Sequence, residues 1–232
     1  MRKPTTWEVR NAWVASFDIL GFKNFANVKG DSFAAKMIRE DYETVLEHLE
    51  ISVDLKSLGT VSYLWLSDTF VMFSDDDSAS SYRVIQYAAK HFIEECLYSG
   101  VPIRGAISVG SLVTSDDNRS IMGEAFIDAY VTGEDQDWIG LLLSERAITK
   151  AQSLGFEPSR HNFVSSLDIP MRKIPAASVM AYRFQNGAAN FSSPLLPILE
   201  NMKRGAGLTF EKKYDRTMEF IKCNYCHIKD SN

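Results

Sequence analysis

Two short apolar runs with only three residues between them constrain the fold more than any other feature of the sequence. Residues 61–66 and 70–73 are rich in the aromatic and β-branched residues that favour strands. Parallel strands need a crossover of a dozen or more residues, so this pair has to be antiparallel. We therefore predict a tight β-hairpin with Asp68 at its tip.

The segments around this hairpin predict a known strand and helix order. Residues 12–19 form an apolar and aromatic run, and residues 32–55 and 78–98 carry apolar side chains at helical spacing. Residues 103–113 again have the pattern of a strand. The order strand, helix, strand, strand, helix, strand is the ferredoxin-like βαββαβ arrangement, an antiparallel sheet with helices on one face.

The C-terminal part predicts further helices and strands attached to this core. We expect a strand at 121–122, helices at 124–130 and 137–154, a strand at 175–184, and helices at 197–204 and 214–223. Because no linker rich in Pro or Gly interrupts the chain, we expect one α+β domain over residues 1–232. Its core spans about 12–135, and a C-terminal helical and strand extension spans about 136–232.

Charge and cysteine content exclude several classes of protein. Lys and Arg number 25 against 30 Asp and Glu, a net charge of −5 that is unsuited to tight nucleic-acid binding. Three cysteines do not make a disulfide framework. No apolar run approaches the roughly 20 residues of a spanning helix, and no signal segment is visible. We expect a cytoplasmic protein with neither nucleic acid nor membrane as partner.

Two aspartates mark a candidate site. Asp18 lies near the end of the first strand and Asp68 at the hairpin tip, and the predicted topology brings these positions to one sheet edge. Paired carboxylates suit hard divalent cations, which also bind substrate phosphates. The turn after Asp18, residues 20–22, can present backbone N–H groups to phosphate oxygens. A helix cap and a turn residue are the structural alternatives for the two aspartates.

Four segments resemble class III nucleotide cyclase domains. Residues 17–22, Phe-Asp-Ile-Leu-Gly-Phe, resemble the family's opening Asp-Ile-x-Gly-Phe signature, and residues 66–73 resemble its second metal hairpin. Residues 104–110 are similar to its fourth-strand segment, and residues 123–130 to its Gly-x-x-Val-Asn-x-Ala segment. The resemblance covers roughly residues 12–135 in the family's order, and it implies a ferredoxin-like core of the class III nucleotidyl cyclase type.

The resemblance also implies a reaction and an assembly. The ribose 3′-hydroxyl of a nucleoside triphosphate would attack its own α-phosphorus and release diphosphate. Two divalent cations, Mn²⁺ or Mg²⁺, would be held by the catalytic carboxylates of Asp18 and Asp68 and by the backbone carbonyl of Ile19. Phosphates would bind backbone amides of Leu20, Gly21 and Phe22. Family members are head-to-tail dimers, so a homodimer with composite interface sites is implied.

The departures from the family concern base recognition and the transition state. The lysine and aspartate that read a purine fall at Leu64 and near Ser120, and the transition-state asparagine and arginine fall at Ile127 and Val131. None of these four positions keeps the family's residue. Standard adenine recognition is therefore not expected, and other residues must stabilise the developing charge if the chain is active.

The short hairpin and replaced base readers are similar to the compact pyrimidine cyclases of bacterial Pycsar antiphage systems. This implies that UTP is converted to 3′,5′-cyclic UMP, a second messenger read by a separate cyclic-nucleotide-sensing effector. CTP, giving cyclic CMP, is the alternative. Tyr63, with Trp65 as its rival, would bind the base edge, and Arg104 would bind base or phosphate.

Two other functions remain open from the residues alone. The lost asparagine and arginine favour a catalytically degenerate nucleotide-binding module of cyclase fold, whereas retention of Asp18 and Asp68 opposes it. A palm-like polymerase or cyclic-dinucleotide synthase would share the ferredoxin-like core. Such enzymes usually carry paired acids, and Asp68 is followed by Thr69 and Phe70.

Overall fold

The structure is a computed structural model in which residues 6–21, 61–66, 68–115, 120–184, 195–206 and 208–226 are described. The helix predicted over 32–55 and Phe22, a predicted phosphate-binding residue, lie outside these ranges.

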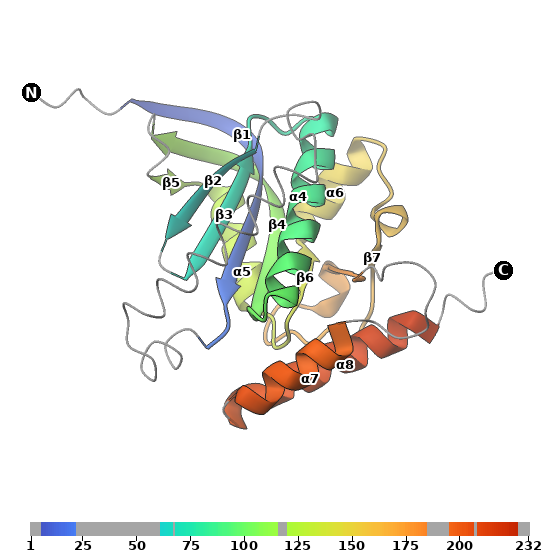
Figure 1. Ribbon diagram of the computed structural model, residues 1–232. Coiled ribbons are helices and arrows are strands. Elements are labelled where there is room, and N and C mark those ends of the chain that lie inside the picture. The colour runs from blue at the N-terminus through green and yellow to red at the C-terminus, as the bar shows by residue number, and fades with distance from the viewer. Residues whose placement is uncertain are drawn as a thin grey trace, which may run out of the picture.

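One mixed sheet organises the described chain, in the order β2-β3-β1-β4-β6-β8-β7, with β5 paired to β4. The strands are β1 (Trp7–Ile19), β2 (Val61–Leu66), β3 (Thr69–Ser74), β4 (Ile103–Ser115), β5 (Ile121–Met122), β6 (Leu141–Leu143), β7 (Phe163–Val164) and β8 (Met180–Tyr182). The predicted hairpin is confirmed, because Leu66 pairs with Thr69. β1 lies between β3 and β4, as the ferredoxin-like order requires (Figure 1).

The helices are α4 (Ala79–Tyr98), α5 (Glu124–Glu134), α6 (Glu145–Ser153), α7 (Leu195–Gly205) and α8 (Leu208–Cys226), with 3₁₀ turns η1 (Pro158–His161) and η2 (Ala176–Ser178). The helix predicted over 137–154 is wrong in its first half. Three fully buried leucines form β6 there and pair in parallel with β4. The helix begins only after Ser144, whose hydroxyl accepts a hydrogen bond from the Ala147 N–H.

Helices pack on both faces of the sheet: α4 of the predicted ferredoxin-like core lies on one face, and α5, which follows that core in the chain, lies on the other. On one face, the Phe17 and Phe70 rings pack on Phe92 of α4 at centroid distances of 4.8 and 4.4 Å. On the other face, Val14 and Val71 pack with the alanines of α5. Because successive side chains of a strand alternate between faces, the side of β1 that includes Val14 also includes Asp18.

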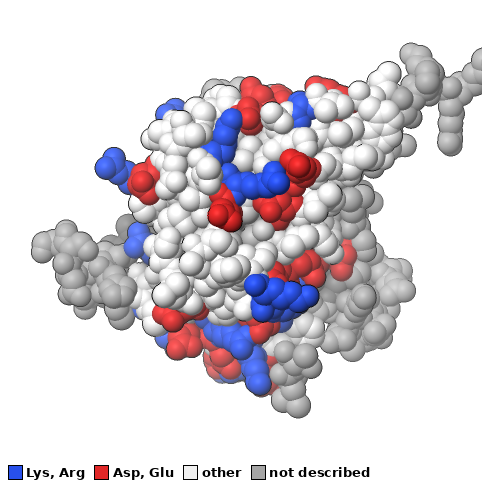
Figure 2. Space-filling model, turned by 180° about the vertical axis from the view of Figure 1, so that it is seen from behind, with Lys and Arg blue, Asp and Glu red and all other residues white. Residues whose placement is uncertain are grey.

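The C-terminal helices close one end of the sheet, where α7 and α8 lie below the strand ends in Figure 1. Tyr214, Met218 and Ile221 of α8 belong to the main hydrophobic core. None of the described helices is long and apolar enough to cross a membrane. On the face shown in Figure 2, basic and acidic side chains of the described residues are interspersed.

Candidate active site

The two aspartates lie at the ends of neighbouring strands. Asp18 of β1 pairs with Thr69 of β3, the residue that follows Asp68. The Ile19 N–H donates a hydrogen bond of 3.2 Å to the backbone carbonyl of Asp68. The predicted convergence of the two positions at one edge is therefore present in the fold.

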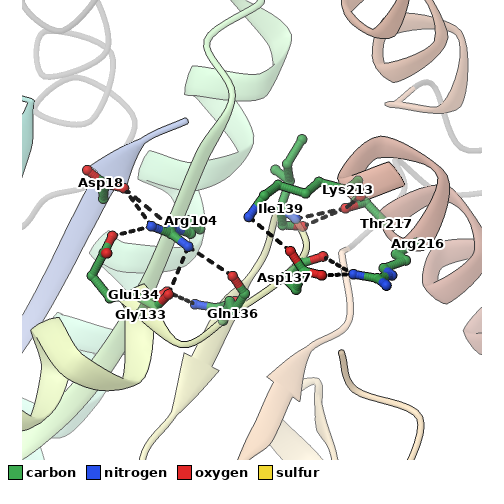
Figure 3. Close-up of polar contacts among 10 residues, drawn as sticks. All are labelled: Asp18, Arg104, Gly133, Glu134, Gln136, Asp137, Ile139, Lys213, Arg216 and Thr217. Atoms are coloured by element: carbon green, nitrogen blue, oxygen red, sulfur yellow. Dashed lines mark hydrogen bonds and ion pairs between the residues drawn. The ribbon is translucent and has the colours of Figure 1, made fainter. Parts of the chain in front are cut away.

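Arg104 of β4 holds the Asp18 carboxylate. Its Nε and Nη2 donate to Asp18 Oδ2 at 3.3 and 3.1 Å, and Nη2 also pairs with the Glu134 carboxylate (Figure 3). Nη1 donates to the backbone carbonyls of Glu134 and Gln136, both at 2.9 Å. Each guanidinium N–H thus has an acceptor, which allows Arg104 to be buried at 5% exposure. Arg104 binds the Asp18 carboxylate, and its binding of base or phosphate stays a prediction.

Burial has the largest effect on the pKa of the Asp18 carboxyl. It raises the pKa of Asp18 to about 7, although the Arg104 guanidinium acts in the opposite direction. The neighbouring Glu134 carboxyl raises the pKa of Asp18 further. The Asp18 side chain nevertheless keeps 21% of its surface exposed, so an ion can reach it from solvent.

Tyr130 and Glu134 of α5 also belong to this face of the site, although neither was predicted as a site residue. Burial and the carboxylates of Glu134, Asp18 and Asp68 raise the pKa of the Tyr130 hydroxyl, so that hydroxyl lies within their field. Residues four apart share one face of a helix. This spacing was available as a signal, but the predicted helix stopped at Tyr130 and left Glu134 outside it.

Leu20 and Gly21, the described residues of the predicted phosphate-binding turn, already make contacts within the chain. The Leu20 N–H donates to the Pro102 carbonyl at 2.8 Å. Gly21 has φ +78°, a conformation that favours glycine, and a Cβ at this position would lie 3.6 Å from the Phe210 ring of α8. Phe210 of the C-terminal helix therefore lies against Gly21, a contact that the sequence did not indicate.

The strand register does not bring Tyr63 to Asp18. Tyr63 pairs with Met72 and stacks on Phe70, with centroids 5.8 Å apart, on the α4 face of the sheet. Asp18 lies on the α5 face. Trp65, two positions after Tyr63, shares its face, whereas Leu64 shares the face of Asp18. The half-exposed Tyr63 ring therefore points away from the Asp18 carboxylate of the same chain.

The donor set fits a pair of hard divalent cations. Carboxylates and backbone carbonyls are the oxygen ligands that Mg²⁺ and Mn²⁺ prefer, with substrate phosphates completing the coordination. Among the described residues, no group of three or more His, Cys, Asp or Glu side chains could hold a metal by itself. A cation at Asp18 and Asp68 would thus depend on backbone and substrate oxygens.

Comparison with solved structures identifies the fold. No protein-family model and no curated protein sequence matches this chain. The adenylyl cyclase CyaB from P. aeruginosa is 13% identical, with a TM-score of 0.53 over 81% of this chain and 100% of that chain. The catalytic core of a rhodopsin-guanylyl cyclase with converted specificity, in complex with ATPalphaS, is 13% identical, with a TM-score of 0.54 over 76% of this chain and 96% of that chain.

A third structure is the monomeric guanylyl cyclase domain of the RhoGC fusion protein from the aquatic fungus Blastocladiella emersonii. It is 15% identical, with a TM-score of 0.51 over 65% of this chain and 90% of that chain. The chain has the class III nucleotide cyclase fold. In this cyclase fold, the two segments that resemble the metal-binding motifs end on adjacent strands, β1 and β3.

Proposed function

We propose that this chain is a nucleotide cyclase that closes a nucleoside triphosphate into a 3′,5′-cyclic monophosphate. The ribose 3′-oxygen forms a bond to the α-phosphorus, the bond to the leaving diphosphate breaks, and the hydroxyl proton leaves to solvent. The observation that carries the proposal is the adjacency of Asp18 and Asp68 at the ends of paired strands. The adenylyl and guanylyl cyclases that share the fold support the reaction class.

Side-chain and backbone groups of the site have separate roles in the proposed reaction. Asp18, Asp68 and the Ile19 carbonyl would hold two Mn²⁺ or Mg²⁺ ions, which activate the attacking hydroxyl and neutralise phosphate charge when bound. Arg104, once Asp18 is engaged by a cation, has Nε and Nη2 available for phosphate oxygens or a base carbonyl. Backbone amides of Leu20, Gly21 and Phe22 would bind the phosphates, for which the Leu20 N–H has to leave the Pro102 carbonyl.

We assign UTP as substrate and cyclic UMP as product, with CTP and cyclic CMP as the alternative. The family's purine-reading lysine position is occupied by Leu64, on the same face as Asp18, where it offers no charge to a purine. Tyr63 stays a predicted base-binding residue. Because it lies on the opposite face from Asp18, it could act only from another direction, such as a partner subunit. The antiphage messenger role and the separate effector rest on the sequence resemblance.

A homodimer is the proposed assembly. Ile127, Tyr130 and Val131 are large, exposed side chains spaced three and four residues apart on α5, the helix that packs on the Asp18 face of the sheet. Exposed apolar groups gathered on one side often mark a protein interface. Ile127 and Val131 stand where the resembled family has its transition-state residues, so a partner would have to supply other groups to the composite site.

The test is incubation with each of the four NTPs and Mn²⁺, followed by mass spectrometry of the products. Cyclic UMP as the main product supports the assignment, and cyclic CMP supports the alternative. Asp18→Asn and Asp68→Asn keep the side-chain shape, so each is expected to abolish turnover while circular dichroism remains unchanged. Linear or dinucleotide products would overturn the cyclase proposal.

A degenerate nucleotide-binding module is the second candidate. The full engagement of Arg104 and the apolar residues at Ile127 and Val131 favour it. Under this candidate, wild-type protein binds a nucleoside triphosphate in equilibrium dialysis but converts none of the four. Turnover that is lost in Asp18→Asn would exclude it.

A further inference from the structure

The segment between α5 and β6 connects Arg104 to the C-terminal helix. On one side, the Glu134 and Gln136 carbonyls accept from Arg104 Nη1, each at 2.9 Å. Gln136 is fully buried, and its amide nitrogen donates to the Gly105 carbonyl of β4 at 2.8 Å. The guanidinium that holds Asp18 is therefore itself held by this segment.

The other side of the same segment is tied to α8. Thr217 is fully buried, and its hydroxyl oxygen accepts a 2.8 Å hydrogen bond from the Ile139 N–H. The Asp137 carboxylate pairs with Arg216 and lies 3.2 Å from Lys213 Nζ. Figure 3 shows this arrangement, with Arg104 on one side of the segment and the α8 side chains on the other.

α8 also meets the site at a second place. The Phe210 ring lies against Gly21, the glycine of the predicted phosphate turn. Phe210, Lys213 and Thr217 are spaced three and four residues apart, so they lie on one face of the helix. One helical face thus contacts both the turn that follows Asp18 and the segment that supports Arg104.

We propose that α8 is a positioning element of the active site, with Thr217 as its main positioning residue. Through Ile139, Thr217 fixes the segment whose carbonyls orient Arg104, and Arg104 sets the position of the Asp18 carboxylate. Loss of the hydrogen bond between Ile139 and Thr217 lets the Arg104 guanidinium and Asp18 shift, which weakens divalent-cation binding. The cation-binding part of this inference rests on the proposed function, whereas the mechanical link to Arg104 does not.

Thr217→Val tests the hydrogen bond between the Ile139 N–H and the Thr217 hydroxyl with little change in side-chain shape. The variant keeps the side-chain volume but removes the acceptor of the Ile139 N–H. Thr217→Ser keeps the hydroxyl and is the rescue variant. Thr149→Val is the matched control, because it removes a threonine hydroxyl that bonds only within exposed α6, to the Glu145 carbonyl.

Two readouts are measured on each folded variant. Hydrogen–deuterium exchange of the peptide covering 133–140 is expected to rise about tenfold in Thr217→Val, and to stay at the wild-type rate in Thr217→Ser and Thr149→Val. The Mn²⁺ concentration that half-saturates binding, measured by calorimetry, is expected to rise about tenfold in Thr217→Val alone. Excess Mn²⁺ should then restore part of any lost turnover, which a general folding defect would not allow.

Each outcome decides one question. Unchanged exchange over 133–140 in Thr217→Val overturns the proposal, as does raised exchange with unchanged Mn²⁺ affinity. If Thr217→Val does not fold, Asp137→Asn replaces it, because this change weakens both α8 ion pairs and should raise exchange over the same peptide. A wild-type protein that binds Mn²⁺ but cyclises no nucleotide would refute the proposed function. The positioning role of α8 would then still be decided by exchange over 133–140 and by Mn²⁺ affinity.

Discussion

At the scale of single residues, Arg104 decides the geometry of the site. A guanidinium presents five N–H donors in a fixed plane, and here these donors meet four acceptor atoms on Asp18, Glu134 and Gln136. The motif in the sequence indicated that Arg104 belongs to the site. Its acceptors could not be predicted, because two of them are backbone carbonyls that tertiary packing brings to β4.

Arg104→Lys is expected to lower the free energy of unfolding by about 1–3 kcal/mol, because a lysine has three donors and leaves at least one buried acceptor unpaired. Urea unfolding at neutral pH measures the change. Arg204→Lys, at an exposed position near the end of α7, is the control and should behave as wild type. Equal midpoints for the two variants would show that the Arg104 network contributes little to folding.

Lys213 predicts a pH dependence. Burial, together with Arg104 and Arg172, lowers the pKa of Lys213 to about 8. The acidic groups that act on Lys213 are Asp137, Glu134 and Asp18. Between pH 8 and the ordinary lysine value of 10.5, the unfolded chain binds a proton that the folded chain has lost. The contribution of Lys213 to stability therefore rises with pH across this window.

The stability of wild type relative to Lys213→Met is expected to increase by about 1–3 kcal/mol from pH 7 to pH 10. Urea unfolding of both proteins at several pH values measures the difference, and Lys212→Met on the exposed side of α8 controls for the loss of one charge. A constant difference across this range would mean that Lys213 keeps its ordinary pKa.

At the scale of elements, strands and hairpins followed from local patterns, whereas the segment after α5 did not. Residues 141–143 have no alternation, because both faces of β6 are buried, and a continuous apolar run does not distinguish a strand from a helix. Whether this run became a strand or a helix was decided by β4, with which residues 141–143 pair as a parallel strand. The pairing of β4 with β6 on one side and β1 on the other makes β4 a central strand, and Gly105 is closely packed against β1.

Gly105 is expected to tolerate no side chain. A Cβ there would lie 2.4 Å from the Phe17 ring and 2.7 Å from the Ser16 carbonyl, and a backbone atom cannot move aside cheaply. Gly105→Ala should lower the free energy of unfolding by about 2–3 kcal/mol, as overpacking does. Gly205→Ala, with no atom within 4 Å of the new methyl, is the matched control. Thermal melts of both variants compare them, and similar midpoints would contradict the packing argument.

At the scale of the whole molecule, the proposed dimer depends on the exposed apolar surface of α5. Val131→Glu places a charge beside Ile127 and Tyr130, and is expected to weaken self-association about a hundredfold. Light scattering after size-exclusion chromatography measures the mass. Leu167→Glu changes an exposed leucine on another element and should leave the mass unchanged. A wild-type protein that is monomeric at high concentration would contradict the proposed dimer interface on α5.

The sequence by itself determined the order of β1, β2, β3, α4 and β4, the hairpin with Asp68 in its turn, and the meeting of Asp68 with Asp18. These follow from hydrophobic periodicity, a short connection and the topology that the order implies. Only the tertiary structure decided which sheet face carries Tyr63, which acceptors hold Arg104, and that α8 reaches the site. A shift of one residue in register exchanges the two faces of a strand, and a C-terminal helix can dock only where distant strands leave an apolar surface. Both depend on contacts between parts of the chain that no local pattern describes.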